Sequence, residues 1–488
     1  MRKYHIGIID LVTNAPAHSI YDRILVANYT GIMPQVIAIW CEQQGHKVSY
    51  FVYTGFENLM EDLPDDLNIV FISAFTCSAQ LAYALSNMLR SKNIITILGG
   101  PHARSYPQDA RKYFDYVAGL SDKALICDIL ADCAQYRPLG IHLASGKHPE
   151  TLPGIRERWN YIKVALQKSY IKIVPVTASF GCPYTCEYCV DAEIPYRLLD
   201  LNTLKEDLIF VKENMKKPRI VWCDPNFGIQ FNPIMNMIEE ADPGNRIEFI
   251  AESNLSLLTE DRLKRFKKNG FKAMLVGVES WFEHNRKSKS ETIDGENKVS
   301  LVSGLINQIQ SYIPYVQSNF ILGLDIDTGI ESFRLTKRFV DMTPGVFPAY
   351  CLFTVFGTST EHYRRYQNEN RIIPFAFHLL SNNTLNIRPL NFTWQEFYRN
   401  VIDLTRYSFS PRAVYDRFRY TKESIPAWLG LLRALTFEGI GRLRYYSKIL
   451  QLLQTDRQMI RFYEQESTAQ PEFYINKINL MKILSINI

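Results

Sequence analysis

Residues 181–189 read Gly-Cys-Pro-Tyr-Thr-Cys-Glu-Tyr-Cys and place three cysteines at the spacing Cys-x3-Cys-x2-Cys. This loop follows an apolar run, residues 171–176, that predicts a buried strand. Thiolates at such a spacing can bind one iron–sulfur cluster from a single loop. Because only three thiolates are supplied, a four-iron cluster would keep one iron free for a substrate or cosubstrate. Gly181 lets the backbone turn out of the strand, and Pro183 stiffens the bend.

A zinc site and a set of three unrelated thiols are the alternatives for this loop. Zinc requires a fourth ligand close by. The nearest histidine candidates, His142 and His148, lie more than thirty residues upstream of the first cysteine. The spacing therefore favours an iron–sulfur cluster over zinc.

The bulk composition limits the class of protein. A chain of 488 residues predicts two or three domains, and 47% hydrophobic with 22% charged residues is typical of a globular protein. The net charge is +5, and residues 401–450 alone carry nine Lys and Arg against four Asp and Glu. Because the basic character is local, no nucleic-acid partner is expected. No uncharged apolar stretch reaches the roughly 18 residues that a membrane span needs.

The N-terminus and the cysteine usage indicate a cytoplasmic protein. Residues 1–6 lead directly into a short strand that ends near Asp10, so they do not resemble a signal peptide. The nine cysteines are scattered along the chain and do not suggest a disulfide framework. A reducing cytosol would also protect an oxygen-sensitive cluster.

Residues 1–135 alternate strand-like and helix-like segments, which predicts a parallel, doubly wound sheet of the Rossmann-like (flavodoxin) type. Ligands bind such sheets at the carboxyl ends of the strands. Two stretches mark that edge, Ser73–Thr76 and Gly99–His102. The expected strands are Ile6–Leu11, Val48–Tyr53, Leu67–Ser73, Ile94–Leu98 and Tyr116–Ala118. The expected helices are Gln35–Gln44, Ala79–Arg90, Pro107–Tyr113 and Asp122–Cys133.

A linker over residues 136–170, rich in proline and glycine, separates this domain from a second β/α series over residues 171–360. Residues 361–488 are expected to be mostly helical. The second series has six expected strands, and barrels of this kind place their chemistry at the carboxyl ends of the strands. These strands are Lys172–Ala178, Ile220–Trp222, Ile247–Ala251, Lys272–Gly277, Tyr315–Leu322 and Ala349–Thr354.

The cysteine loop resembles that of the radical S-adenosylmethionine (radical SAM) superfamily. The resemblance implies a 4Fe-4S cluster on Cys182, Cys186 and Cys189, and a partial (β/α)6 barrel built from the six strands. In that superfamily the open iron chelates the amino and carboxylate groups of S-adenosylmethionine. An electron from the cluster then cleaves the cosubstrate to a 5′-deoxyadenosyl radical.

The same resemblance implies contacts to S-adenosylmethionine at the strand ends. The stretch Gly277-Val278-Glu279-Ser280 is similar to the family's Gly-Ile-Glu-Ser motif, and Asp224 would bind the ammonium group of the cosubstrate. For each residue alone, a surface carboxylate or a turn glycine is the alternative. The full set of implied contacts is Tyr188, Asp224, Glu252, Gly277, Glu279, Ser280 and Gly323.

The upstream domain resembles the cobalamin-binding domain of the cobalamin-dependent radical SAM family, most closely at Gly-Gly-Pro-His. The Asp-x-His-x-x-Gly motif of many cobalamin enzymes is absent, and His18 lacks its spacing. The resemblance therefore implies cobalamin without this histidine ligand. A Rossmann-like domain whose Gly-Gly merely turns the chain is the alternative. The implied contacts are Ser73, Thr76, Gly99, Gly100, Pro101 and His102.

These features together imply a cobalamin-dependent radical SAM methyltransferase. The deoxyadenosyl radical would abstract hydrogen from an unactivated carbon, which then takes a methyl group from methylcobalamin, and a second S-adenosylmethionine remethylates the cobalt. A non-methylating radical reaction (cyclisation, ring contraction or oxidation) and a non-catalytic cobalamin or redox sensor are the alternatives. The substrate stays open among a small molecule, a lipid, a tetrapyrrole and a peptide. An electron donor such as flavodoxin or ferredoxin is implied.

The C-terminal stretch Ile425–Leu453 mixes apolar and basic residues. It could lie on a membrane surface and reach a lipid substrate, which would make the protein peripheral to the membrane. A helical cap over the barrel mouth with a solvated basic face is favoured instead, because Gly430, Gly439 and Gly441 interrupt the periodicity.

Overall fold

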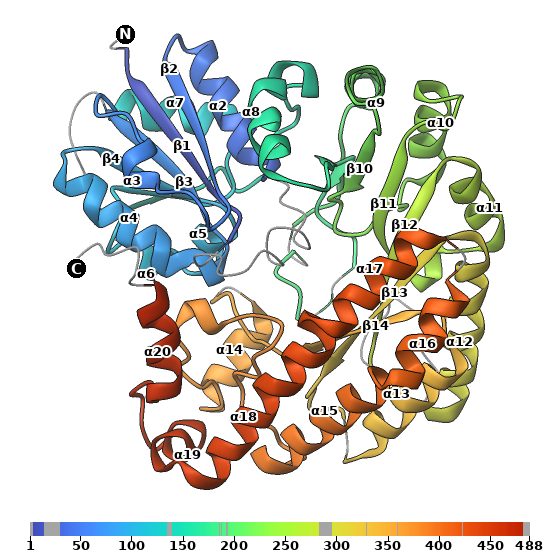
Figure 1. Ribbon diagram of the computed structural model, residues 1–488. Coiled ribbons are helices and arrows are strands. Elements are labelled where there is room, and N and C mark those ends of the chain that lie inside the picture. The colour runs from blue at the N-terminus through green and yellow to red at the C-terminus, as the bar shows by residue number, and fades with distance from the viewer. Residues whose placement is uncertain are drawn as a thin grey trace.

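The computed structural model describes residues 3–13, 30–133, 139–184, 186, 188–191, 194–282, 295–327, 329–358, 360–421 and 423–481. Within these ranges the chain forms two six-stranded parallel sheets, a small antiparallel pair and a helical C-terminal region (Figure 1). The predicted α/β class with parallel strands is confirmed. His18 lies outside the described residues.

The first sheet has the strand order β2-β1-β3-β4-β5-β6, and all its strands are parallel. β6 was not predicted, because its three residues are too few to show a pattern and they follow a segment that contains proline and glycine. It pairs with β5 and places part of the expected linker inside the sheet. The strands are β1 His5–Leu11, β2 Lys47–Tyr53, β3 Ile69–Ser73, β4 Ile95–Gly99, β5 Tyr116–Ala118 and β6 Ile141–Leu143.

Helices cover both faces of the first sheet, which makes it doubly wound. Helices α2, α7 and α8 bury Trp40, Ile126 and Tyr161 against one face. Helix α4 buries Leu81 and Leu85 against the other. The central strands β1, β3 and β4 are therefore largely buried on both sides, as is usual in parallel sheets. The elements are α2 Ile32–Gln43, α3 Leu59–Asp62, η1 Thr76–Ser78, α4 Ala79–Ser91, α5 Pro101–Ser105, α6 Pro107–Ala110, α7 Lys123–Asp132 and α8 Ile155–Lys168.

The second sheet has the order β14-β13-β12-β11-β10-β7 and is also all parallel. Helices α9 to α13 line its outer face (Figure 1). The strands are β7 Val174–Val176, β10 Arg219–Trp222, β11 Glu248–Asn254, β12 Phe271–Glu279, β13 Tyr315–Leu322 and β14 Phe347–Leu352. The helical elements are α9 Leu201–Asn214, α10 Phe231–Ala241, η2 Leu255–Leu257, α11 Glu260–Lys268, α12 Gly295–Tyr312 and α13 Glu331–Met342.

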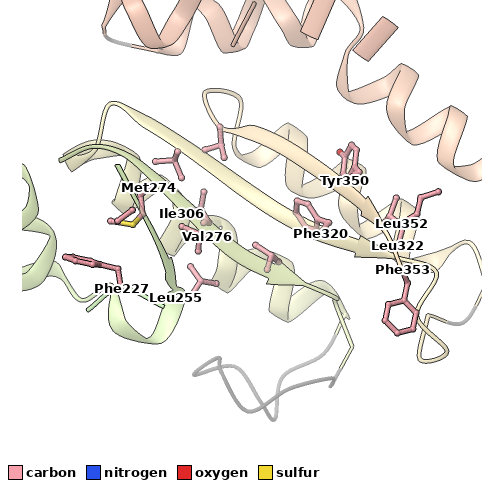
Figure 2. Packing of buried hydrophobic residues seen from close by; sticks show 14 of the residues in the cluster. Phe227, Leu255, Met274, Val276, Ile306, Phe320, Leu322, Tyr350, Leu352 and Phe353 are labelled. Carbon is pink, nitrogen blue, oxygen red and sulfur yellow. The ribbon is translucent and has the colours of Figure 1, made fainter. Parts of the chain in front are cut away.

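The core of this second unit lies between the sheet and its outer helices (Figure 2). Val276 and Phe320 on neighbouring strands pack in the same cluster as Ile306 of α12. Side chains alternate between the two faces along a strand. The residues next to Val276 and Phe320 in the sequence, Gly277 and Asn319, therefore face the inside of the curved sheet. That inner face is where the second series presents its polar groups.

The C-terminal region packs on the second sheet differently from the expectation. Arg433 of α17 donates to the hydroxyl of Tyr315 and to Oε1 of Gln317, both at 2.6 Å. Tyr315 and Phe347 begin their strands, and Gly430 of α17 also lies beside Phe347. Helix α17 therefore covers the amino ends of β13 and β14 and not the barrel mouth, and its basic face is partly buried. The elements are α14 Glu361–Asn368, η3 Phe377–Leu379, α15 Trp394–Ser408, α16 Pro411–Tyr420, α17 Ser424–Leu435, the π-helix η4 Phe437–Gly441, α18 Arg442–Thr455, α19 Arg457–Tyr463 and α20 Glu472–Met481.

No helix among the described residues is both long enough and apolar enough to span a bilayer. On the outside of α17, Ile425 and Trp428 are exposed.

Two contacts hold the carboxyl edge of the first sheet against the second unit. Arg104 of α5 forms an ion pair with Asp191 just beyond the cysteine loop, at 2.7 Å. Thr358, which follows β14, donates its backbone N–H to the carbonyl of Ser105 at 2.9 Å. The loop after β4 and the cysteine loop are therefore neighbours in space, although 80 residues of sequence lie between them.

Candidate active site

The cysteine loop lies between the short strands β8 (Ser179–Phe180) and β9 (Arg197–Leu198). Cys182 and Cys186 are buried, and Cys189 is half-buried. The backbone N–H of Cys189 donates to the carbonyl of Cys186 at 2.9 Å, which closes a tight turn. The described residues contain no group of three or more His, Cys, Asp and Glu side chains close enough to hold a single metal ion.

Gly181 makes the entry into this loop possible. Its φ is +67°, a left-handed conformation that side chains disfavour. A Cβ atom at this position would lie 2.4 Å from the carbonyl oxygen of Pro195 and 2.5 Å from that of Ile194. The returning arm of the loop, residues 194–195, therefore packs directly on the glycine.

We expect Gly181→Ala to destabilise the protein by roughly 2–5 kcal/mol, the sum of the left-handed backbone cost and the overpacking cost. Chemical denaturation and the iron content after reconstitution would measure the effect. Gly146→Ala is the matched control, because Gly146 also has a positive φ but has no described atom within 4 Å of the added carbon. A Gly181 variant no less stable than the Gly146 variant would contradict the proposed close packing.

Asp224, which follows β10, supports the strand that leads into the cysteine loop. Its carboxylate accepts the N–H of Ala178 at 3.0 Å and the hydroxyl of Ser179 at 2.5 Å. Burial raises the pKa of this carboxyl to about 6, and the hydrogen bonds from Ser179 and Ala178 partly oppose the rise. Asp224 is almost fully buried, and its carboxylate oxygens accept hydrogen bonds from the protein itself. This geometry favours a positioning role over the expected contact with an ammonium group.

The end of β12 contains a strained residue. Glu279 has a φ of +65°, and the pairing with β13 shifts register between Gly277 and Glu279. Left-handed conformations at residues other than glycine cluster at functional sites. A Cβ atom on Gly277 would lie 2.3 Å from Oε1 of Glu279. Gly277 therefore makes room for the neighbouring carboxylate, whereas the family resemblance implied a contact with S-adenosylmethionine.

Two carboxylates lie near one another on the inner face of the second sheet. Burial raises the pKa of the Cys351 thiol to about 11, Arg442 opposes the rise, and the charges of Glu279 and Glu252 add to it. The negative charges of both carboxylates therefore reach the same residue, Cys351, in the carboxyl half of β14. Glu252 is exposed at the end of β11. The two carboxylates therefore add negative charge to an inner face that also contains Arg442.

Ser280 and Gly323 make contacts within the protein that stabilise the fold. The Ser280 hydroxyl donates to Asp327 at 3.1 Å, in the loop after β13. Gly323 has a φ of +92°, and a Cβ there would lie 3.1 Å from the ring of Phe397 on α15. Their buried contacts explain these residue types without a ligand. Tyr188, also expected at the cosubstrate, is half-buried against the main core.

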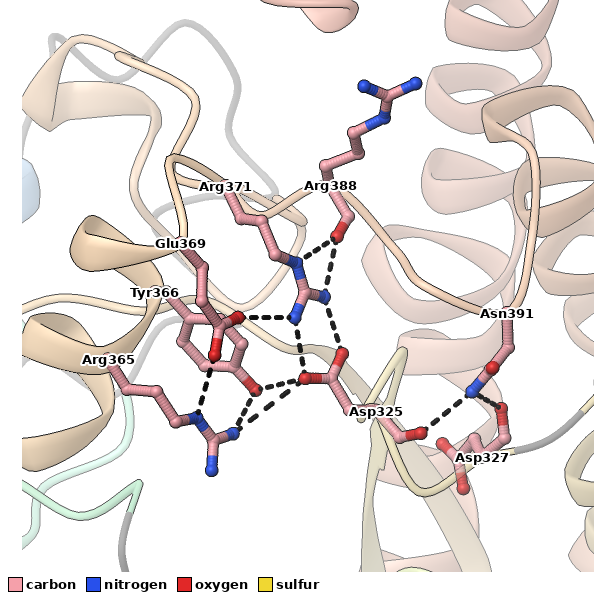
Figure 3. A network of polar contacts seen from close by, with 8 residues as sticks. All are labelled: Asp325, Asp327, Arg365, Tyr366, Glu369, Arg371, Arg388 and Asn391. Carbon is pink, nitrogen blue, oxygen red and sulfur yellow. Dashed lines mark hydrogen bonds and ion pairs between the residues drawn. The ribbon is translucent and has the colours of Figure 1, made fainter.

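A polar network fixes the loop after β13 to the C-terminal region (Figure 3). Arg371 donates to both carboxylate oxygens of Asp325, at 2.6 and 2.8 Å, and Tyr366 donates to the same carboxylate at 3.0 Å. The Asn391 amide donates to the backbone carbonyls of Asp325 and Asp327. Paired hydrogen bonds of this kind give both strength and orientation.

Replacing Asp325 with asparagine should cost on the order of 2 kcal/mol, because Arg371 loses the partner that binds it through two oxygens in a half-buried site and keeps only Glu369, at 3.1 Å. Burial alone would raise the pKa of Asp325, but the hydrogen bonds and charge of Arg371 outweigh it and hold the pKa below its usual value. The stabilisation is therefore complete above the unfolded pKa of about 4 and is lost as the pH falls through the folded pKa. The difference in unfolding free energy between wild type and variant, followed by urea denaturation, should shrink as the pH falls below 4. A difference independent of pH would contradict the ion pair.

On the first sheet, β3 and β4 end side by side. Ser73 pairs with Gly99, and the N–H of Ala74 donates to the carbonyl of Gly99 at 3.2 Å. Gly100 has a φ of +87°, and a Cβ there would lie 2.9 Å from the carbonyl oxygen of Ala74. Gly99 differs, because no described atom lies within 4 Å of the position its Cβ would take. The surface above Gly99 is therefore open. Pro101 begins α5 beside it.

His102 and Thr76, both expected at cobalamin, are buried. The His102 ring lies 2.6 Å from the Tyr83 hydroxyl and 3.4 Å from the Thr76 hydroxyl, and the ring of Phe377 packs against it. Burial lowers the pKa of His102 to about 4, so the ring is neutral. Both side chains hold the loop in place, and the imidazole is not presented at the sheet edge.

Two features of this edge were missed from the sequence. Phe75, inside the predicted stretch Ser73–Thr76 but without a predicted contact, has 61% of its surface exposed two residues after Ser73, the partner of Gly99. Its position after a strand was the available signal. The ion pair of Arg104 with Asp191 could not be found, because the two residues meet only in the folded chain.

Comparisons with known proteins agree with this architecture. Residues 176–302 match the sequence profile described as Radical SAM superfamily. The chain is 21% identical over 381 residues to bacteriochlorophyllide d C-12(1)-methyltransferase of Chlorobaculum tepidum, covering 76% of this chain and 82% of that protein.

Two solved structures share the fold. One is the radical S-adenosylmethionine methyltransferase TsrM from Kitasatospora setae, with a TM-score of 0.59 and 12% identity over 91% of this chain and 99% of that one. The other is the cobalamin-dependent S-adenosylmethionine radical enzyme OxsB, with a TM-score of 0.57 and 12% identity over 99% of this chain and 79% of that one. The matched domain contains the cysteine loop and the strands β10, β11 and β12. The chain therefore contains a region that matches the radical SAM superfamily, and it is similar in sequence to a methyltransferase and in fold to a cobalamin-dependent radical SAM enzyme.

Proposed function

We propose that this protein is a cobalamin-dependent radical SAM methyltransferase that methylates an unactivated carbon. One observation carries the proposal: the open edge above Gly99 and the cysteine loop are held together in one chain by the Arg104–Asp191 ion pair. Cobalamin at the edge of the first sheet and the cluster on the cysteine loop would then face the same space between the two sheets.

The cysteine loop suits a cluster by its chemistry. Cys182, Cys186 and Cys189 supply three thiols from one loop, two of them buried away from water. Asp224 fixes the strand before the loop, and Gly181 lets its two arms meet. Glu252 and Glu279 present negative charge from neighbouring strands, which suits the cationic sulfonium and ammonium groups of S-adenosylmethionine.

The edge of the first sheet suits a large flat cofactor. Gly99 leaves open space, and the exposed ring of Phe75 offers an apolar contact beside it. When bound, the cluster would supply the electron that cleaves S-adenosylmethionine, and cobalamin would supply the methyl group. The chain would hold the reactants in line and exclude water.

Product analysis would test this function. With a strong reductant and methyl-labelled S-adenosylmethionine, we expect one deoxyadenosine and one S-adenosylhomocysteine for each methylated product. A chlorophyllide-like tetrapyrrole is the first substrate to try, because the relative from Chlorobaculum tepidum is named for such a compound. Deoxyadenosine without S-adenosylhomocysteine would indicate a non-methylating radical reaction. Cofactor binding with no cleavage at all would indicate a sensor.

A further inference from the structure

Arg417 of α16 is a buried cation that no carboxylate neutralises among the described residues. Only 5% of its surface is exposed. Its Nε donates to the carbonyl of Val346 at 2.9 Å and its Nη2 to the carbonyl of Ser408 at 3.0 Å. Nη1 has no hydrogen-bond partner within the described part of the chain. Buried charges are normally paired, because removing an ion from water costs several kcal/mol.

The charges around Arg417 do not supply the missing partner. Arg417 and Arg433 both lie over the ring of Phe347, with Cζ 5.4 and 4.2 Å from its centre. The nearby carboxylate, Glu438, already lies 3.3 Å from Arg433 and 2.8 Å from Arg442. This region therefore buries three arginines against one glutamate. Burial lowers the pKa of Arg417 to about 10, which agrees with an uncompensated charge.

A small cavity adjoins this arginine. It has a volume of about 10 Å³, roughly the space that one water molecule or one small ion needs. Tyr315 and Arg417 contribute polar groups to its wall, and Phe347 and Phe418 contribute aromatic rings. The Tyr315 hydroxyl accepts a hydrogen bond from Arg433, and its own hydrogen has no acceptor among the described contacts. Arg417, whose Nη1 has no described partner, and Tyr315 therefore both line one small cavity.

We propose that this cavity binds one chloride-sized monovalent anion, held by Nη1 of Arg417 and the hydroxyl of Tyr315. An anion there would neutralise Arg417 and join α16 to the amino ends of β13 and β14. The site lies at the opposite end of these strands from the cysteine loop, so its role is to secure the C-terminal helices. It does not depend on the proposed methyl transfer.

The test compares the thermal unfolding midpoint of the full chain in sodium chloride and in sodium gluconate at equal ionic strength. We expect the midpoint to be higher in chloride by about 2 °C or more, rising with chloride concentration by mass action. Crystals soaked in bromide should show an anomalous peak within hydrogen-bond distance of Nη1. Equal midpoints in the two salts, or a water in place of bromide, would overturn the proposal.

Variants separate this site from a general salt effect. Arg417→Met should abolish the difference between chloride and gluconate, and Tyr315→Phe should reduce it. Arg412→Met is the matched control, because the Arg412 side chain on the same helix is 92% exposed, and it should keep the full difference. If Arg417→Met does not fold, the comparison of the two salts with the wild type and with Tyr315→Phe still tests whether the cavity binds an anion. A Tyr315→Phe variant with an undiminished chloride effect would exclude the assigned donor.

Discussion

Cys186→Ala should abolish both the visible absorbance of the reconstituted iron–sulfur cluster and all formation of deoxyadenosine. Cys186 is buried in the loop, and a backbone hydrogen bond joins it to Cys189. Removing one of three ligands leaves two thiolates for four irons, which is too few to hold the cluster. Anaerobic reconstitution, iron analysis and chromatography of the reaction products would measure the loss.

Cys127→Ala is the matched control for this experiment. Cys127 is a half-buried thiol on α7, in the first domain and away from the cysteine loop. We expect it to keep wild-type iron content and wild-type cleavage of S-adenosylmethionine. Turnover retained in Cys186→Ala, or zinc in place of iron in the wild-type protein, would remove the basis of the radical assignment.

Gly99→Leu should lower cobalamin retention at least tenfold while the protein stays folded. The position has no left-handed φ, and no described atom lies within 4 Å of the added carbon. The Cβ of a leucine there meets no described atom, and the side chain would extend into the space proposed for the cofactor. Its effect on stability should therefore stay within about 0.5 kcal/mol, as for other exposed sites. The corrinoid absorbance of the reconstituted protein measures retention.

Gly304→Leu is the matched control, because Gly304 is an exposed glycine on α12 whose added carbon also meets no described atom. It should bind cobalamin like the wild type. If the two cofactors act in sequence, Gly99→Leu should still produce deoxyadenosine but no methylated product. Wild-type corrinoid binding by Gly99→Leu would place the cofactor elsewhere or exclude it.

Much of the fold could be predicted because each strand carries its own signal. β1 and β13 are strands of seven and eight residues rich in Ile, Val, Leu and aromatic residues, and their predicted bounds agree within one residue. β6 escaped prediction because a three-residue strand with partly exposed side chains has no periodic pattern. Its place is set by pairing with β5, which is a long-range contact.

The location of the site was predicted at the strand ends, because parallel strands bring their carboxyl ends to one edge, and this location stays a prediction. At Asp224 and His102, however, the residue type suggested a ligand contact, and the structure shows side chains bonded to the protein itself. A polar residue at a strand end can serve either purpose, and local sequence does not distinguish the two.

The sequence by itself determined the cysteine spacing, the order of the β/α units and the glycines at the two sheet edges, because these depend on neighbours along the chain. Only the tertiary structure decided that α17 covers the amino ends of β13 and β14, that Glu279 adopts a left-handed conformation, and that Arg417 is buried without a carboxylate. Burial and charge pairing arise between segments far apart in the chain. Their energies therefore depend on how the segments meet, and no local pattern records that.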